Sequence, residues 1–207
     1  PKKHYPSMMP AHEVFELRCM QEIAKRDHVL DVGGGSRFQK GMKKYASLFA
    51  NTRYETMDVS VDYSPDIVGD IHLIPLAEAS VDAIICRSVL EHVQDPQKAM
   101  QEMYRILKPG GVLFLQVPST YPYHARKGFG AYPDYWRFFA DTLEMMGASF
   151  RSVKLVKHGG WFMAMSFFCP GQAKIRGFLN VCATFFDRLF STEKKTTTAF
   201  YTGLFTK

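Results

Sequence analysis

Three consecutive glycines follow an apolar segment near the start of the chain, in the stretch HVLDVGGGS at residues 28–36. The apolar residues before them predict a buried strand, and residues 38–49 after them are typical of a helix. Glycine at such a turn lets a ligand approach the backbone closely, because no Cβ stands in the way. The turn therefore predicts a ligand site at the end of the first strand, with a ligand-free flexible turn as the alternative.

Segments typical of strands and of helices alternate along the chain, which predicts a parallel sheet covered by helices. The apolar face of residues 12–25 predicts one helix. Asp95 and Pro96 predict the start of another, because Asp is a good N-cap and Pro suits the first helical position. Four further strands are predicted at residues 52–59, 66–71, 81–88 and 111–118, and a short helix at residues 141–148.

The composition fits one folded domain and argues against several classes of protein. Of the 207 residues, 46% are hydrophobic and 14% are aromatic, which is enough to bury a core. The net charge of +6 comes from scattered Lys and Arg residues, so no nucleic-acid partner is expected. The four cysteines form no CxxC pair, which argues against a metal site or a disulfide framework and favours a cytoplasmic location. No signal peptide or membrane-spanning run is visible, and the chain begins at Pro1 rather than at methionine, as a segment of a longer protein would.

The spacing of the glycines separates the ligands that this turn can bind. A dinucleotide fingerprint starting at Gly33 would need glycine at position 38, where the chain has Phe38, and a phosphate-loop pattern is absent. Asp58 ends the second strand, where a carboxylate can accept hydrogen bonds from both hydroxyls of a ribose, with a loop or N-cap aspartate as the alternative. Asp70 and Ile71 follow the third strand, where they could contact an adenine. Together these elements predict a nucleoside site without phosphates.

From about residue 28 to residue 168 the chain resembles the class I S-adenosylmethionine-dependent methyltransferases, of the methyltransferase type 11 kind that acts on small molecules. The resemblance is carried by LDVGGGS, MDVS and GDIHLIPL, and by the run from VDAIICRSVLEHV to GGVLFLQVP. It implies a Rossmann-like α/β fold with a seven-stranded open sheet in the order 3-2-1-4-5-7-6, the last strand antiparallel and helices on both faces. It also implies S-adenosylmethionine as the cofactor and methyl transfer as the activity.

The resemblance implies a cofactor site at the ends of the first four strands. Asp31 and the glycines would contact the methionine part, Asp58 would hold the ribose, and Asp70 would face the adenine. The residues after the fourth strand would line the mouth near the methionyl end. The full set implied for the cofactor is Asp31, Gly33, Gly34, Gly35, Asp58, Val59, Asp70, Ile71, Arg87, Ser88 and His92. The chain departs from the common D-x-G-x-G-x-G form at Arg37, where the third glycine would stand.

Residues 117–139 follow the fifth strand and are rich in aromatic residues and prolines, as a lid or an acceptor pocket would be. His124 is the first candidate for a general base, because imidazole titrates near neutral pH, with a hydrogen-bonded loop histidine as the alternative. His92 is the second candidate. Tyr123 and Asp134 complete the predicted catalytic group. The residues predicted to bind the acceptor are Tyr121, Tyr135, Trp136 and Arg137, although Asp134 and Arg137 could instead pair to hold the loop.

A small molecule or a glycan is the expected acceptor. An amino-group methylase of DNA would carry [DN]-P-P-[YFW] after the fourth strand, where this chain has CRSV. The stretch YPYH followed by DYWRF is similar to methyltransferases of bacterial glycan and cell-surface polysaccharide synthesis, which favours a sugar hydroxyl. Two alternatives stay open: a module that binds the cofactor without turnover, and a nicotinamide-dependent reductase on a similar sheet.

The end of the chain is expected to lie outside the sheet. Residues 150–168, with a Gly-Gly pair in the middle, predict a hairpin that completes the sheet. The methyltransferase domain would then span residues 1–169, with a helical segment at 1–26, and residues 170–207 would form an amphipathic helix and a tail. Residues 172–190 have apolar side chains at helical spacing. This predicts a helix that docks on the domain or across a homodimer, or one that lies on the inner face of a membrane near a lipid-linked acceptor.

Overall fold

A computed structural model describes residues 9–39 and 41–207 of the chain. Its centre is a seven-stranded sheet in the order β3-β2-β1-β4-β5-β7-β6, which confirms the predicted fold. The five strands from β3 to β5 are parallel, and β7 runs antiparallel to both β5 and β6. The strands are β1 (His28–Val32), β2 (Arg53–Asp58), β3 (Ile67–Val68), β4 (Val81–Arg87), β5 (Leu107–Pro118), β6 (Ser152–His158) and β7 (Phe200–Thr206).

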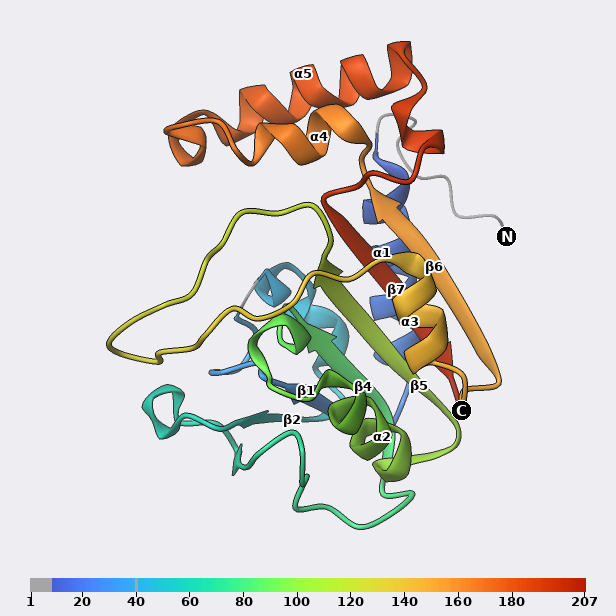
Figure 1. Ribbon diagram of the computed structural model, residues 1–207. Helices are drawn as coiled ribbons and strands as arrows, with labels where there is room; N and C mark the ends of the chain where they lie inside the picture. The colour runs from blue at the N-terminus through green and yellow to red at the C-terminus, as the bar shows by residue number, and fades with distance from the viewer. Residues whose placement is uncertain (1–8, 40) are drawn as a thin grey trace.

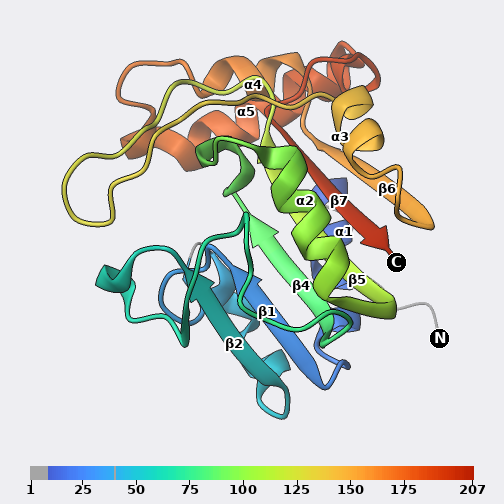
Figure 2. The same ribbon diagram turned by 60° about the horizontal axis from the view of Figure 1, so that its bottom comes forward.

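Helices cover both faces of the sheet, as Figure 1 and Figure 2 show. On one face lie α1 (Ala11–Ile23) and the 3-10 helix η1 (Met42–Phe49), which form one hydrophobic cluster with the strands. On the other face, α2 (Pro96–Ile106) and α3 (Ala140–Met146) form the second cluster. Because side chains alternate along a strand, the buried strands contribute to both clusters.

The predicted helix starts agree with the structure in most places. Asp95 caps α2, since its Oδ1 accepts a hydrogen bond from the Lys98 N–H at 2.9 Å, and Pro96 is the first helical residue. The helix predicted at residues 38–49 is a 3-10 helix from Met42 onward, and Lys40 lies outside the described residues. The N-terminal helical segment predicted at 1–26 is α1, while residues 1–8 also lie outside the described part.

The hairpin predicted for residues 150–168 is wrong. Its first strand is β6, but the apolar run after it forms the helix α4 (Trp161–Ser166), and the strand that pairs with β6 is β7. A short apolar run has the same pattern in a buried strand and in a buried helix, so its periodicity did not separate the two. The chain leaves the sheet after β6, forms α4 and α5 (Arg176–Leu189), and then returns to it. The sheet therefore includes residues beyond the boundary expected at residue 169.

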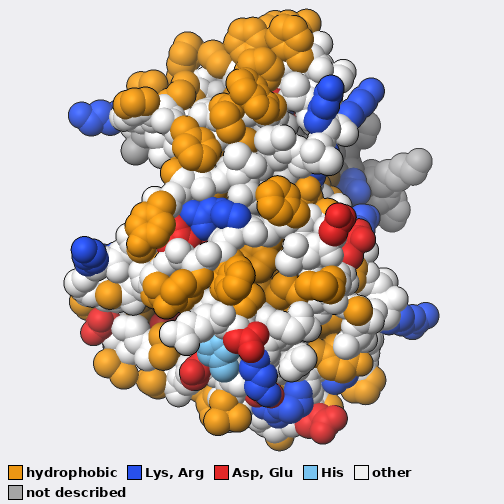
Figure 3. Space-filling view, in the orientation of Figure 1, with side chains coloured by type: hydrophobic (Ala, Val, Ile, Leu, Met, Phe, Trp, Pro, Cys, Tyr) orange, Lys and Arg blue, Asp and Glu red, His pale blue; other side chains and the backbone are white. Residues whose placement is uncertain are grey.

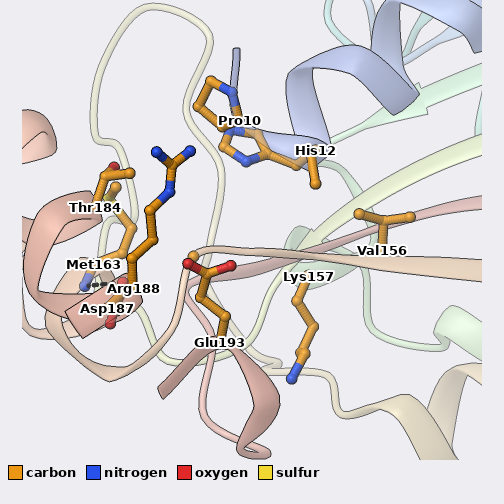
Figure 4. A pocket seen from close by; sticks show the side chains of 11 residues that line it. Pro10, His12, Val156, Lys157, Met163, Thr184, Asp187, Arg188 and Glu193 are labelled. Atoms are coloured by element: carbon orange, nitrogen blue, oxygen red, sulfur yellow. Dashed lines mark hydrogen bonds between the residues drawn. The ribbon is translucent and has the colours of Figure 1, made fainter. Parts of the chain in front are cut away.

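The helices α4 and α5 lie side by side above the sheet, at the end where β6 stops and β7 begins (Figure 1). Asp187 of α5 is 1% exposed and joins the two helices. Its carboxylate accepts hydrogen bonds from the N–H groups of Gly160, Phe162 and Met163 at 2.8, 2.8 and 3.1 Å. These N–H groups belong to the start of α4, where a helix has no internal partners for them. Figure 4 shows the bond to Met163, beside a cavity of about 230 Å³ between this helix pair and the start of α1.

His12 of α1 and His158 at the end of β6 stack on each other, with ring centroids 3.6 Å apart. Burial lowers the pKa of His12 to about 4, because a charged ring would lose its hydration. Burial likewise lowers the pKa of His158 to about 3. Both rings are therefore neutral in the folded protein near neutral pH, and they hold α1 against the end of β6.

We expect this histidine pair to make the fold less stable as the pH falls below about 6.5, the ordinary pKa of an exposed imidazole. Below that pH the unfolded chain binds more protons than the folded chain, so each histidine lowers the free energy of unfolding by about 1.4 kcal/mol per pH unit. The free energy of unfolding stops falling on this account near pH 4 for His12 and near pH 3 for His158, their pKa values in the folded protein. Urea titrations at pH 7 and at pH 5 measure the free energy of unfolding. Between these two pH values it should fall by roughly 2 kcal/mol less in His158→Gln than in the wild type. Equal pH sensitivity of the two proteins would contradict this account.

Candidate functional site

The glycine triplet forms a tight turn at the carboxyl end of β1. Gly33 and Gly35 have φ angles of +66° and +61°, which glycine adopts without strain. A Cβ on Gly33 would lie 2.4 Å from Cγ2 of Val89, so the turn packs directly against the segment after β4. Both glycines line a cavity of about 700 Å³, whereas Gly34 packs on the side chain of Asp31. The turn thus exposes bare backbone to the cavity, as the sequence predicted.

Asp58 lies at the end of β2 and lines the same cavity, with Val59 beside it. Its Oδ2 accepts a hydrogen bond from the Gly35 N–H at 3.1 Å, and its Oδ1 accepts one from the Ser60 N–H at 2.9 Å. Each carboxylate oxygen has a further lone pair, so the fixed carboxylate can still accept hydrogen bonds from two hydroxyl groups. The carboxylate is thus compatible with the predicted contact to the two hydroxyls of a ribose, which stays a prediction.

The segment after β3 forms the next wall of the cavity. Ile71 is only 7% exposed and offers an apolar surface to a planar ring. Asp70 also lines the cavity, and its Oδ1 bonds to the backbone N–H of His72 at 2.8 Å and to His72 Nδ1 at 2.6 Å. These bonds, the backbone one first, lower the pKa of Asp70, so it is a charged acceptor. His72 was not among the predicted site residues, although its position two residues after an aspartate is typical of an Asx turn.

Ser88 and His92 line the cavity, but two residues expected beside them do not. Arg87 lies on the opposite face of the sheet, where its Nη2 is 2.8 Å from Oε1 of Glu16 in α1. The reason is strand alternation: Cys86 belongs to the cluster on the α2 face, so Arg87 must point to the other face. Asp31 is buried on that same face and accepts a hydrogen bond from the Tyr54 hydroxyl. Neither side chain is among those that line the cavity, and their contact with the cofactor stays a prediction.

The loop at residues 119–139 crosses the cavity and contacts the turn η2 (Val61–Tyr63) on its far side. The Gly130 N–H donates a hydrogen bond to Oδ2 of Asp62 at 2.9 Å, and Arg126 donates one to the Tyr63 hydroxyl at 3.4 Å. A Cβ on Gly130 would lie 2.0 Å from that hydroxyl. Figure 1 shows this loop in yellow-green, between β5 and α3. Residues of the loop therefore form part of the cavity wall and contact η2, as a lid would, and these contacts were not visible in the sequence.

Glu91, His92 and His124 form a cluster at the wall of the cavity. Glu91 is fully buried in the turn η3 (Leu90–His92), and its Oε1 lies 3.7 Å from His92 Nε2 and 3.8 Å from His124 Nε2. His92 lines the cavity, and the ring of His124 packs against the His92 ring with centroids 4.9 Å apart. Glu91, and then Asp134, raise the pKa of His124 against the opposing effect of burial. The predicted base therefore stands next to the cavity-lining histidine rather than in the cavity wall.

Most of the other residues predicted for the acceptor site hold the lid together. Arg137 donates hydrogen bonds to both carboxylate oxygens of Asp134 at 2.6 and 2.8 Å, and to the backbone oxygen of Tyr121 at 2.9 Å. Although burial opposes it, the bonds from Arg137 lower the pKa of Asp134 to about 2. The Trp136 indole donates to a backbone oxygen after η3, and Tyr123 is 77% exposed. The residue of this predicted set that lines the cavity is Tyr135.

Comparisons with known proteins find similar methyltransferases. Residues 30–115 match the family model of the methyltransferase domain. The ubiquinone biosynthesis O-methyltransferase of Coxiella burnetii is 29% identical over 124 residues, which is 52% of this chain and 52% of that protein. The chain therefore spans about half the length of the curated relatives it matches. A methyltransferase structure from Archaeoglobus fulgidus has a TM-score of 0.59 at 15% identity over 95% of both chains. One from Mesorhizobium loti has a TM-score of 0.55 at 17% identity, covering 95% and 98%.

The cavity has the features that S-adenosylmethionine requires. Gly33 and Gly35 present backbone where a Cβ would stand, Asp58 holds an oriented carboxylate, and Ile71 gives an apolar wall. Phe38, which replaces the third glycine of a dinucleotide fingerprint, stacks on Tyr54 with ring centroids 4.6 Å apart. Taken with the match of residues 30–115 to the methyltransferase domain and with the strand order, these features support a class I S-adenosylmethionine-dependent methyltransferase domain.

Proposed function

We propose that the protein transfers a methyl group from S-adenosylmethionine to a hydroxyl of a small molecule, with a sugar hydroxyl as the preferred acceptor. The observation that carries the proposal is one cavity of about 700 Å³ that is lined both by Asp58 with the glycine turn and by His92 with Tyr135. We assign Asp58 and the glycine turn to the cofactor, and His92 and Tyr135 to the acceptor. The relative from Coxiella burnetii, named as an O-methyltransferase, supports oxygen as the methylated atom.

Bound S-adenosylmethionine supplies a methyl carbon on a positively charged sulfur, which keeps the electron pair of the C–S bond when that bond breaks. The acceptor oxygen forms the new C–O bond and loses its proton, so the products are a methyl ether, S-adenosylhomocysteine and a proton. The protein has to align the reacting atoms and exclude water. We assign alignment to Asp58 and the glycine turn, and the exclusion of water to the lid that Gly130 and Arg126 anchor.

The proton of the acceptor hydroxyl leaves beside the cluster of Glu91, His92 and His124. His92 lines the cavity, so it is the imidazole that we place next to the acceptor. His124 and Asp134, predicted as catalytic residues, are proposed to orient this cluster, since Asp134 Oδ2 lies 3.1 Å from Nδ1 of His124. Tyr123 is exposed on the lid, and we assign it no part in the reaction.

A sugar ring fits the exposed aromatic side chains of the lid. Tyr135 and Trp136 are 50% and 43% exposed, and the indole of Trp136 is held by its bond to the Val93 oxygen at 2.9 Å. Aromatic faces that are held in place offer apolar area to a ligand at a low cost in conformational entropy. A phenolic hydroxyl is the competing acceptor, and an activity assay distinguishes the two.

The test is a methyl-transfer assay with labelled S-adenosylmethionine and a panel of sugars, sugar phosphates and phenols. We expect methylation of a sugar hydroxyl, and Asp58→Ala should weaken cofactor binding by about 1–3 kcal/mol, the range for charge-assisted hydrogen bonds lost from a site. Asp82→Asn is the matched control, because Asp82 pairs with Lys108 at 2.8 Å near the start of β4 and should leave cofactor affinity unchanged. An unchanged affinity in Asp58→Ala would remove the ribose assignment, and transfer to phenols alone would remove the sugar.

We also infer that the apolar face of α5 lies on the inner face of a membrane and brings the enzyme to a lipid-linked acceptor. The buried residues of α5 are Ala183 and Asp187, whereas Phe178, Val181 and Phe185 are 69%, 71% and 60% exposed. Figure 3 shows hydrophobic side chains gathered on this upper part of the molecule. Within the described residues, no helix is both long and apolar enough to cross a bilayer. An exposed apolar helix face with nearby Lys and Arg suits the surface of an anionic membrane.

Sedimentation of the assay sample with vesicles tests this placement. We expect the protein to sediment with vesicles that contain anionic lipid and to lose that binding in Phe178→Glu, which puts a negative charge on the exposed face. A homodimer that covers the same face is the competing arrangement. It would appear as a doubled mass in light scattering, with no binding to vesicles.

A further inference from the structure

A buried carboxylate without hydrogen-bond donors lies beside the cofactor cavity. Glu91 is 0% exposed, and in the described part of the chain neither Oε1 nor Oε2 receives a hydrogen bond. An unpaired charge in such a place costs several kcal/mol, so a carboxylate that stays ionised there needs a cation beside it. The backbone around it is well fixed, because the Glu91 oxygen accepts hydrogen bonds from the N–H groups of Tyr135 and Trp136 at 2.7 and 3.2 Å.

Two imidazole rings direct their Nε2 atoms toward this carboxylate. Nδ1 of His92 is bonded to the backbone oxygen of Pro133 at 2.5 Å, and a carbonyl only accepts, so Nδ1 carries the proton and Nε2 has a lone pair in the neutral ring. Nδ1 of His124 faces two acceptors, the Pro122 oxygen at 3.2 Å and Oδ2 of Asp134 at 3.1 Å. Histidines that bind metals are commonly held in this way, by a carbonyl or a carboxylate at the other nitrogen.

The distances suit three ligands around one ion. The ligand atoms of Glu91, His92 and His124 all lie within 4.8 Å of one another. An ion about 2.0–2.2 Å from each atom would bring them to roughly 3.0–3.6 Å apart, which requires side-chain shifts of less than about 1 Å. The present separations of 3.7 and 3.8 Å between the imidazoles and Glu91 are too long for hydrogen bonds, so no such bond has to break.

We propose that Glu91, His92 and His124 bind a divalent transition-metal cation of the Zn²⁺ or Mn²⁺ class, with open positions for the acceptor. Two imidazoles and one carboxylate favour these ions over Ca²⁺ and Mg²⁺, which take oxygen ligands. The inference rests on the proposed methyl transfer and narrows its acceptor to compounds with two neighbouring hydroxyls, which can chelate the ion. His92 lines the cavity, so the ion borders the space of the acceptor oxygen. A hydroxyl bound to such an ion gives up its proton to water more readily, which prepares the oxygen for the methyl group.

The test measures ion binding directly. In equilibrium dialysis with Zn²⁺ or Co²⁺, the wild type should bind one ion per chain, with Co²⁺ giving the visible absorption of an imidazole-ligated ion. Glu91→Gln and His124→Gln should each bind the ion at least about 100-fold more weakly, because each removes a ligand. His28→Gln is the matched control: His28 is also a buried histidine, with Nε2 2.6 Å from Oε2 of Glu55, but it lies at the start of β1 and should bind the ion as the wild type does.

Thermal unfolding checks that the variants are folded. In the presence of a chelator, Glu91→Gln should unfold at the same or a higher temperature than the wild type, because it removes a buried carboxylate that accepts no hydrogen bond. Added Zn²⁺ should raise the melting temperature of the wild type but not that of Glu91→Gln. Ion binding no tighter in the wild type than in folded Glu91→Gln would overturn the inference. Methyl transfer without ion binding would remove the metal site and leave the proposed function. Ion binding without methyl transfer would remove the proposed function and leave the metal site.

Discussion

Replacing Phe205 with alanine should lower the free energy of unfolding by about 3–5 kcal/mol, the range for a large aromatic side chain removed from a core. Phe205 of β7 is 0% exposed, and its ring centroid lies 5.4 Å from that of Phe150. Its ring also packs so closely on Gly147 and Gly203 that a Cβ on either would lie 2.7 Å from it. The lost contacts would therefore leave a cavity that the neighbouring backbone cannot fill.

Phe178→Ala is the matched control for this prediction. It makes the same chemical change at a side chain that is 69% exposed on α5, so it should alter the free energy of unfolding by less than about 0.5 kcal/mol. Urea titrations followed by circular dichroism measure both variants. Equal destabilisation by the two substitutions would contradict the placement of β7 inside the sheet, between β5 and β6.

Gly33→Ala should abolish measurable binding of S-adenosylhomocysteine, a loss of at least about 100-fold, or 2.7 kcal/mol. The new Cβ would lie 2.4 Å from Val89 Cγ2, in a turn whose backbone faces the cofactor cavity. To make room, either the turn or the segment after β4 has to move. Both line the cavity, so either movement changes the cofactor site.

Gly110→Ala separates this effect from backbone strain. Gly110 has a φ of +74°, close to the +66° of Gly33, but a Cβ there would meet nothing within 4 Å. Alanine pays a similar conformational cost at both positions, so both variants should lose roughly 1 kcal/mol of stability from strain alone. Calorimetric titration should then show normal affinity in Gly110→Ala. Normal affinity in Gly33→Ala as well would remove the glycine turn from the cofactor site.

The fold could be predicted where local patterns are unambiguous. The strands around the glycine turn and the capped start of α2 follow from apolar runs and from Asp95 and Pro96, and the structure confirms them. The order of the strands came from the family resemblance, since no local pattern encodes it. The prediction failed where β6 finds its partner. β7 lies more than 40 residues away from β6 in the chain, and the apolar run that follows β6 fits a strand and a helix equally well.

Some residues of the candidate site could be predicted from local sequence, and others only from the folded chain. Asp58, Ser88 and His92 were predicted from their positions at strand ends, and the structure places them in one cavity. The motif gives the positions of Arg87 and Asp31 along their strands but not the face to which each side chain points, and here Arg87 contacts Glu16 and Asp31 contacts Tyr54. The lid contacts join residues 63 and 68 positions apart in the sequence, so they follow from the folded chain alone. Glu91 was overlooked because its buried, unpaired carboxylate is a property of the packing.

Calorimetric titration of the wild-type protein with S-adenosylhomocysteine, beside a parallel titration with NADH, tests the central claim most directly. The account predicts micromolar binding of S-adenosylhomocysteine and no binding of NADH, because the cavity combines a nucleoside site with a turn that lacks the dinucleotide fingerprint. Binding of NADH in place of S-adenosylhomocysteine would turn the assignment toward a nicotinamide-dependent reductase. Binding of neither would contradict a working cofactor site, and the catalytic proposals would fall with it.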